Sequence, residues 1–229
     1  MHISGLLGAV VALGLSTAAN AASITILPPG DLGPPAGYGT VATFDTITAQ
    51  PYLSTTSSGT FFDGGATFSG GGVVMNNGGK DSGSLYATPY GDATNYLAVL
   101  GGRSEQIDFT GLKSSFGLYW GSVDTYNSLT FYNGNTVVAT ISGADVAPPL
   151  AANGGQTDYA SNGYILISAL PQFDRVVAAS SSNSFEFDNI AAGTSAVPEP
   201  STWAMLLIGF AGIGYAGFRR SKGPIAVFD

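Results

Sequence analysis

The sequence predicts an all-β fold, a two-sheet β-sandwich of jelly-roll type, between an N-terminal signal peptide and a single C-terminal transmembrane helix. Short aromatic and β-branched runs alternate with Gly, Asn, Ser and Asp throughout the middle of the chain. No stretch there keeps a helical apolar period for several turns, and each end of the chain carries an apolar run. We therefore expect a signal peptide at 1–21, a Pro/Gly-rich segment at 22–39, the sandwich at 40–192 and a C-terminal tail at 193–229.

Residues 22–197, which we call the passenger, include the sandwich and contain a series of short candidate strands. In one of them Phe116, Leu118 and Trp120 alternate with less apolar residues, so this face of the strand should lie on the core. The candidate strands are 41–47, 60–68, 72–75, 96–100, 106–109, 115–120, 128–132, 137–141, 164–168, 175–179 and 185–190.

One tight hairpin is predicted within this series. Asn133 and Gly134 lie between the apolar runs 129–131 and 136–138. An Asn-Gly pair tolerates the positive φ angles of a type I′ turn. The two flanking strands should therefore be antiparallel neighbours.

The N-terminus is typical of an exported protein. Residues 3–15 form an apolar run, and Ala19 and Ala21 supply small residues at the two positions that signal peptidase reads. We expect cleavage after Ala21 and a mature chain that starts at Ala22.

The C-terminal tail is typical of a membrane-inserted segment. Residues 203–218 carry no charge, and as a helix they would extend about 24 Å, against a hydrocarbon core of about 30 Å. Trp203 fits one interface, and Arg219, Arg220 and Lys222 fit the cytoplasmic side. The alternative, a buried helix of a soluble domain, would normally show a polar face, and this segment has none.

Rigid prolines, an apolar stretch and a basic cluster follow one another in the order Pro198-Glu199-Pro200, 203–218 and Arg219-Arg220. In this order the tail resembles the PEP-CTERM sorting domain of exosortase-dependent surface proteins. The resemblance implies cleavage at or near the Pro-Glu-Pro motif, loss of the helix, and release or attachment of the passenger at the cell surface. Residues 223–229 extend beyond the basic cluster, where such tails commonly stop.

Composition excludes several functions for the mature chain. There is no cysteine, and the single histidine, His2, leaves with the signal peptide, so disulfides, thiolate metal sites and imidazole-dependent catalysis are excluded. The passenger has four basic residues against thirteen acidic ones, a net charge of 4 − 13, or −9, which excludes nucleic acid as a natural partner. We expect no enzyme activity; the chemistry left open is that of paired carboxylates, as in a polysaccharide hydrolase, or of a Ser-Lys pair.

Two weak candidate sites stand out in the passenger. One is a sugar site made of aromatic rings and polar groups. The favoured interpretation of its two central rings is the ordinary one, in which Trp120 belongs to the core and Tyr119 is a solvated residue of the sheet. The other is a structural calcium site made of aspartates. The favoured interpretation is that these aspartates are ordinary carboxylates of turns and strand edges. Apart from such a calcium ion, we expect no cofactor. The sugar candidates are Tyr119, Trp120, Asp124, Tyr126 and Asn127, and the calcium candidates are Asp45, Asp108 and Asp188.

Taken together, these features predict an exported protein that starts as a membrane-anchored precursor and reaches the cell surface or the extracellular matrix. Signal peptidase and exosortase would be its processing partners. The expected role is structural or adhesive, in exopolysaccharide or biofilm, because only 10% of the residues are charged and a surface of hydroxyls and amides suits neutral polysaccharide. A secreted carbohydrate-binding or polysaccharide-degrading protein that uses carboxylates is one alternative. A permanently anchored periplasmic protein, whose tail stays attached, is another.

Overall fold

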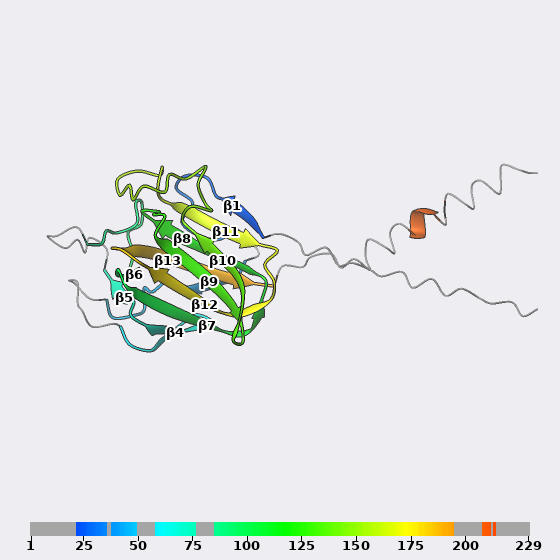
Figure 1. Cartoon of the computed structure of the whole chain (residues 1–229), viewed down its shortest axis with the longest axis horizontal. Helices are drawn as coiled ribbons and strands as arrows, with labels where there is room; N and C mark the ends of the chain where they lie inside the picture. Colours follow the sequence, from blue (N-terminus) through cyan, green and yellow to red (C-terminus); the bar gives the residue numbers. More distant parts are fainter. Residues whose placement is uncertain are drawn as a thin grey trace, which may run out of the picture.

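The computed structural model describes residues 22–35, 38–49, 58–76, 85–194, 208–211 and 213. In residues 22–194 it consists of two antiparallel sheets that face each other across one core (Figure 1). The strands are β1 (Ser23–Ile26), β2 (Thr40–Ala42), β3 (Phe61–Asp63), β4 (Ala66–Gly70), β5 (Val73–Met75), β6 (Tyr96–Val99), β7 (Arg103–Lys113), β8 (Ser115–Gly121), β9 (Asn127–Asn133), β10 (Thr136–Ser142), β11 (Gly163–Ser168), β12 (Phe173–Ser180) and β13 (Phe185–Gly193).

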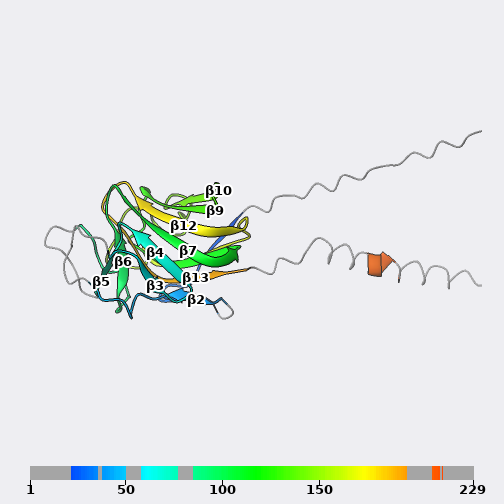
Figure 2. The same ribbon diagram turned by 90° about the horizontal axis from the view of Figure 1, so that it is seen from below.

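The first sheet, sheet A, has the strand order β1-β11-β8-β13-β6-β5, with β2 also paired to β13. The second sheet, sheet B, has the order β10-β9-β12-β7-β4-β3. Figure 2 shows β9, β10 and β12 of sheet B above β2 and β13 of sheet A. The predicted all-β class and the two antiparallel sheets are confirmed, while the jelly-roll subtype stays a prediction.

Aromatic rings from both sheets fill the space between them. Phe116 of β8 meets Phe131 of β9 edge to face at 5.6 Å between ring centroids, and Phe131 meets Phe173 of β12 at 5.1 Å. Trp120 lies 4.5 Å from Phe185 of the neighbouring strand. Each of the two edge-to-face pairs, Phe116–Phe131 and Phe131–Phe173, adds about 0.5–1.5 kcal/mol beyond the area that it buries. The predicted apolar face of β8 therefore does lie on the core.

The expected strand 41–47 is a strand only as far as Ala42, because Phe44 takes a positive φ of 57° and its carbonyl oxygen accepts from the Ile47 N–H in a turn.

Two further segments differ from the sequence prediction. The expected strand 60–68 is a hairpin, because Gly64 takes a positive φ of 58° and Asp63 pairs with Ala66. The Pro/Gly-rich N-terminal segment contributes an edge strand, β1, in which Ile24 pairs with Ile167 of β11. β1 has only four residues, which is too short for the alternation of apolar and polar residues to identify it as a strand from the sequence. Its extended conformation depends on pairing with β11.

The predicted hairpin between β9 and β10 is confirmed, but the turn type is wrong. Asn133 pairs with Thr136, so the two turn residues are Gly134 and Asn135. Of these only Gly134 has a positive φ, 56°. A positive φ at the first turn position alone is the pattern of a type II′ turn, which requires glycine there.

Both ends of the passenger lie at one end of the sandwich, which we call the terminal end. Ser23 at the start of β1 pairs with Ser168, the last residue of β11. The neighbouring Ile167 pairs with Phe116 near the start of β8, and Phe116 pairs with Ala192 near the end of β13. Three strand spacings of about 4.8 Å separate the two ends of the passenger, or roughly 14 Å.

The opposite end of the sandwich carries the long connections and is called the loop end. Residues 27–35 follow β1 there, and residues 143–162 connect β10 to β11. Residues 122–126 and 181–184 are shorter connections at the same end. In Figure 1 the loop end lies on the left and the terminal end on the right.

Candidate functional site

The outer face of sheet A is closed to solvent, because residues 85–95, which we call the cover segment, lie across it. Pro89 lies so close to Gly121 that a Cβ at this glycine would stand 2.8 Å from the proline ring. The hydroxyl of Tyr119 donates to the carbonyl oxygen of Tyr90. Every residue of β8 is consequently buried, on both faces of the strand.

Glu186 on β13 holds the cover segment in place. Its carboxyl accepts hydrogen bonds from the Ala87 N–H at 3.1 Å, from the Ser122 hydroxyl at 2.8 Å and from the Ser184 hydroxyl. Burial raises the pKa of Glu186 to about 7, although these hydrogen bonds act in the opposite direction. The residue therefore joins the cover segment to two connections of the loop end.

A pair of acidic residues, Asp188 and Asp92, lies two residues further along β13. Asp188 is fully buried and contacts the carboxyl of Asp92 in the cover segment. The Thr94 hydroxyl lies 2.7 Å from Asp92 Oδ1 and 3.1 Å from Asp188 Oδ2, while Asp92 Oδ2 and Asp188 Oδ1 have no hydrogen-bond partner among the described residues. Burial first, and then the negative charge of Asp92, raise the pKa of Asp188.

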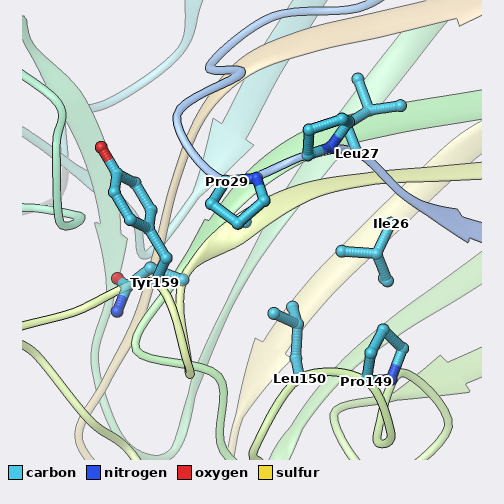
Figure 3. A pocket seen from close by; sticks show the side chains of 9 residues that line it. Ile26, Leu27, Pro29, Pro149, Leu150 and Tyr159 are labelled. Atoms are coloured by element: carbon cyan, nitrogen blue, oxygen red, sulfur yellow. The ribbon is translucent and has the colours of Figure 1, made fainter.

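A hollow of about 360 Å³ opens at the loop end. Figure 3 shows Tyr159, Pro29, Leu27 and Pro149 standing around it. Tyr159 is partly exposed, and its ring meets that of Tyr90 edge to face at 4.9 Å between centroids. The hollow therefore combines aliphatic and proline surfaces with one phenol group.

The side chain of Asn162, which lines this hollow, already makes four hydrogen bonds within the protein. Asn162 Oδ1 accepts from the N–H groups of Tyr90 and Ser122, and its Nδ2 donates to the carbonyl oxygens of Gly155 and Asp158. No carboxylate lines the hollow, and a neighbouring hollow formed by Leu27 and residues 30–35 has only Asp31. Neither hollow offers the two carboxylates that the hydrolase hypothesis requires.

The five sugar-site candidates are only partly brought to the surface. Tyr119, Trp120 and Asn127 are fully buried, so neither ring presents a face on which a sugar can stack. Asp124 and Tyr126 are partly buried at the loop end, where the Tyr126 hydroxyl donates to the Asn183 carbonyl oxygen at 2.6 Å. This placement favours the core interpretation of Trp120, whereas Tyr119 is not the solvated residue that this interpretation included.

The three calcium candidates are not brought together. Asp45 is exposed in the connection after β2, where its Oδ1 accepts from the Asn95 N–H. Asp108 lies on sheet B and accepts from the Gln106 side chain, whereas Asp188 lies on sheet A beside Asp92. In the part of the chain that is described, no group of three or more His, Asp or Glu residues forms a metal-binding cluster.

Sequence reasoning missed Asp92, Glu186 and Tyr159 as members of the loop end and its surroundings. One local signal was present, since Pro89 and Gly91 flank Tyr90 in a turn closed by the hydrogen bond from Asp92 N–H to the Pro89 carbonyl oxygen. That pattern predicts a turn but not what the turn covers.

The predicted sorting residues Pro198, Glu199, Pro200, Trp203, Arg219 and Arg220 all lie outside the described residues, as does the predicted signal peptide. Within the predicted helix 203–218, residues 208–211 and 213 are helical, and Ile208, Phe210 and Ile213 are 64–72% exposed. Among the residues that the structure describes, no helix has the length and hydropathy needed to cross a membrane.

Comparison with family models gives one match. Residues 196–221 match the model of the PEP-CTERM protein-sorting motif, which contains the Pro-Glu-Pro residues, the apolar stretch and the two arginines. Comparisons with curated proteins and with solved structures gave no match. The match covers the tail only, so it assigns sorting and leaves the passenger without an assigned activity.

Proposed function

We propose that the passenger of this exported protein is an adhesive module of the extracellular polysaccharide layer. The PEP-CTERM sorting motif, which exosortase handles, supports the export and sorting part of the proposal. In this proposal the precursor is held in the membrane by residues 203–218. Exosortase then cuts at or near residues 198–200, and the passenger reaches the cell surface or the matrix.

The position of the passenger's two ends supports display of the loop end to the surroundings. β1 begins and β13 ends at the terminal end, so a tail attached after Gly193 leaves from the end opposite the long connections. The loop end would therefore point away from the membrane. The absence of charge in residues 203–218 supports a tail that inserts in the membrane before processing.

The chemistry of the loop end suits a neutral polysaccharide. Aromatic rings and flat aliphatic surfaces bind the C–H faces of sugars, while charges are unnecessary for a neutral ligand. The hollow beside Tyr159 offers such surfaces from three prolines, and no charged side chain lines it. This hollow, on the end opposite the tail, is the observation that carries the adhesive part of the proposal.

The adhesive role is tested with purified protein and a panel of neutral polysaccharides, including the exopolysaccharide of the producing cell. Tyr159→Ala should weaken retention on the polysaccharide at least several-fold. Tyr132→Ala is the matched control, because Tyr132 lies on sheet B under the guanidinium of Arg175 and should bind as the parent does. Equal retention of both variants would remove the loop end as the binding surface.

The sorting route has an independent test in the intact mass of the surface-released protein. A C-terminus near residues 198–200 supports processing. A mass that includes Asp229 would show that the tail is retained and that the protein remains anchored.

A further inference from the structure

Asp92 and Asp188 form a pair of carboxyl groups that lack a cationic partner. Asp188 is fully buried and Asp92 is 9% exposed. The groups that act on the Asp188 carboxyl are Asp92, the Asn189 N–H and Thr94, and none of these is basic. Two adjacent carboxylates in such a site repel each other unless a cation or a shared proton lies between them.

The hydrogen-bond donors around the pair are too few for its oxygen atoms. The Thr94 N–H donates to Asp92 Oδ1 at 2.9 Å, and the Thr94 hydroxyl has one proton for the two carboxylates that it touches. Asp92 Oδ2 and Asp188 Oδ1 are left without a donor among the described residues. Buried oxygen atoms are rarely left without a partner, so either a cation or a proton shared by the two carboxyl groups bridges them.

We propose that Asp92, Asp188 and Thr94 bind a hard divalent cation, with calcium as the best-fitting ion, and that this ion fastens the cover segment to sheet A. Carboxylate and hydroxyl oxygens are the ligands that calcium prefers, and waters complete its coordination. Thr94 is exposed, so the ion reaches the site along the edge of the cover segment. The extracellular location that the sorting motif implies brings the protein into contact with free calcium.

This site shares one residue with the calcium set that the sequence suggested. Asp188 belongs to both sets, while Asp45 and Asp108 are replaced by Asp92 and Thr94. With two carboxylates instead of three, the protein supplies only part of the coordination shell, which favours a moderate affinity.

Cation binding here has a consequence for the loop end. Asp92 closes the turn that begins at Pro89, and Tyr90 in this turn packs against Tyr159 beside the hollow. An ion at Asp92 would hold this turn on β13 and would thereby fix Tyr90 against Tyr159.

The test uses the full chain, purified in detergent and stripped with EDTA. Calcium at about 100 times its dissociation constant should raise the melting temperature by roughly 5–10 °C, and titration calorimetry should show one site. Potassium chloride at equal ionic strength should give no such shift. Asp188→Asn and Asp92→Asn should each abolish the calcium response, whereas the matched control Asp108→Asn should retain it.

The outcomes separate cleanly. If calcium changes neither the melting temperature of the parent protein nor the calorimetric signal, the proposal is overturned. A proton shared between the two carboxyl groups would then explain how they lie together. A response that survives in Asp188→Asn, or that potassium reproduces, would also overturn it. If Asp188→Asn fails to fold, the Asp92→Asn variant decides.

Discussion

Replacing Glu105 by glutamine should make the passenger less sensitive to pH between about 4.5 and 7. Glu105 on β7 is fully buried, and its Oε2 accepts one hydrogen bond, from the Gly72 N–H at 2.8 Å. Its Oε1 has no partner among the described residues. Burial therefore disfavours the charged form and raises the pKa of Glu105 from 4.5 to about 7.

The sign and the size follow from this pKa. Because the folded state holds the proton up to about pH 7 and the unfolded chain releases it near pH 4.5, the free energy of unfolding falls as pH rises through this window. A shift of about 2.5 pKa units corresponds to about 3 kcal/mol, lost by pH 7 and not regained above it. For a domain of this size the loss equals a fall of roughly 6–12 °C in melting temperature.

Urea unfolding at pH 5 and pH 8, followed by tryptophan fluorescence, measures the effect. Glu105→Gln should unfold at nearly the parent's urea concentration at pH 5 and should be more stable than the parent by about 3 kcal/mol at pH 8. Other buried acids such as Glu186 titrate in both proteins, so the difference between the two isolates Glu105. The exposed-site control Asp158→Asn should keep the parent's pH dependence, and an equal loss of stability in Glu105→Gln and the parent would refute the reasoning.

Two further substitutions test the packing of β8. Trp120→Ala should lower the free energy of unfolding by about 3–5 kcal/mol, because it opens a cavity beside Phe185, and a near-neutral effect in urea unfolding would contradict the core placement. Gly121→Ala should cost about 1–3 kcal/mol in thermal unfolding because its Cβ would press on the proline of the cover segment; Gly33→Ala, whose Cβ would meet nothing within 4 Å, is the matched control.

The sequence predicts the fold class and most strands, because the alternation of Phe116, Leu118 and Trp120 and the turn at Gly134 are local patterns. The same reasoning does not predict β1, since four residues before a proline show no clear period. It also does not predict that Tyr119 is buried, because this depends on the cover segment, which has no regular structure of its own.

The acidic groups were the hardest to place from sequence. Asp188 meets Thr94, a residue 94 positions away, and the two are brought together by the path of the cover segment across sheet A. The sequence therefore suggested the separate acids Asp45 and Asp108 and missed the true neighbour of Asp188, which is Asp92. The sorting tail is the opposite case, since its signal lies in consecutive residues and needs no tertiary contact to be identified.

The attachment of the tail to β13 has a mechanical consequence. β13 is an interior strand of sheet A, with β8 on one side and β6 and β2 on the other. Tension applied through Gly193, with the loop end gripped by a polymer, acts along this strand and at right angles to the hydrogen bonds on both of its sides. The ladder is then loaded in shear, so many bonds must break together, whereas an anchor on an edge strand such as β1 would be held by a single ladder.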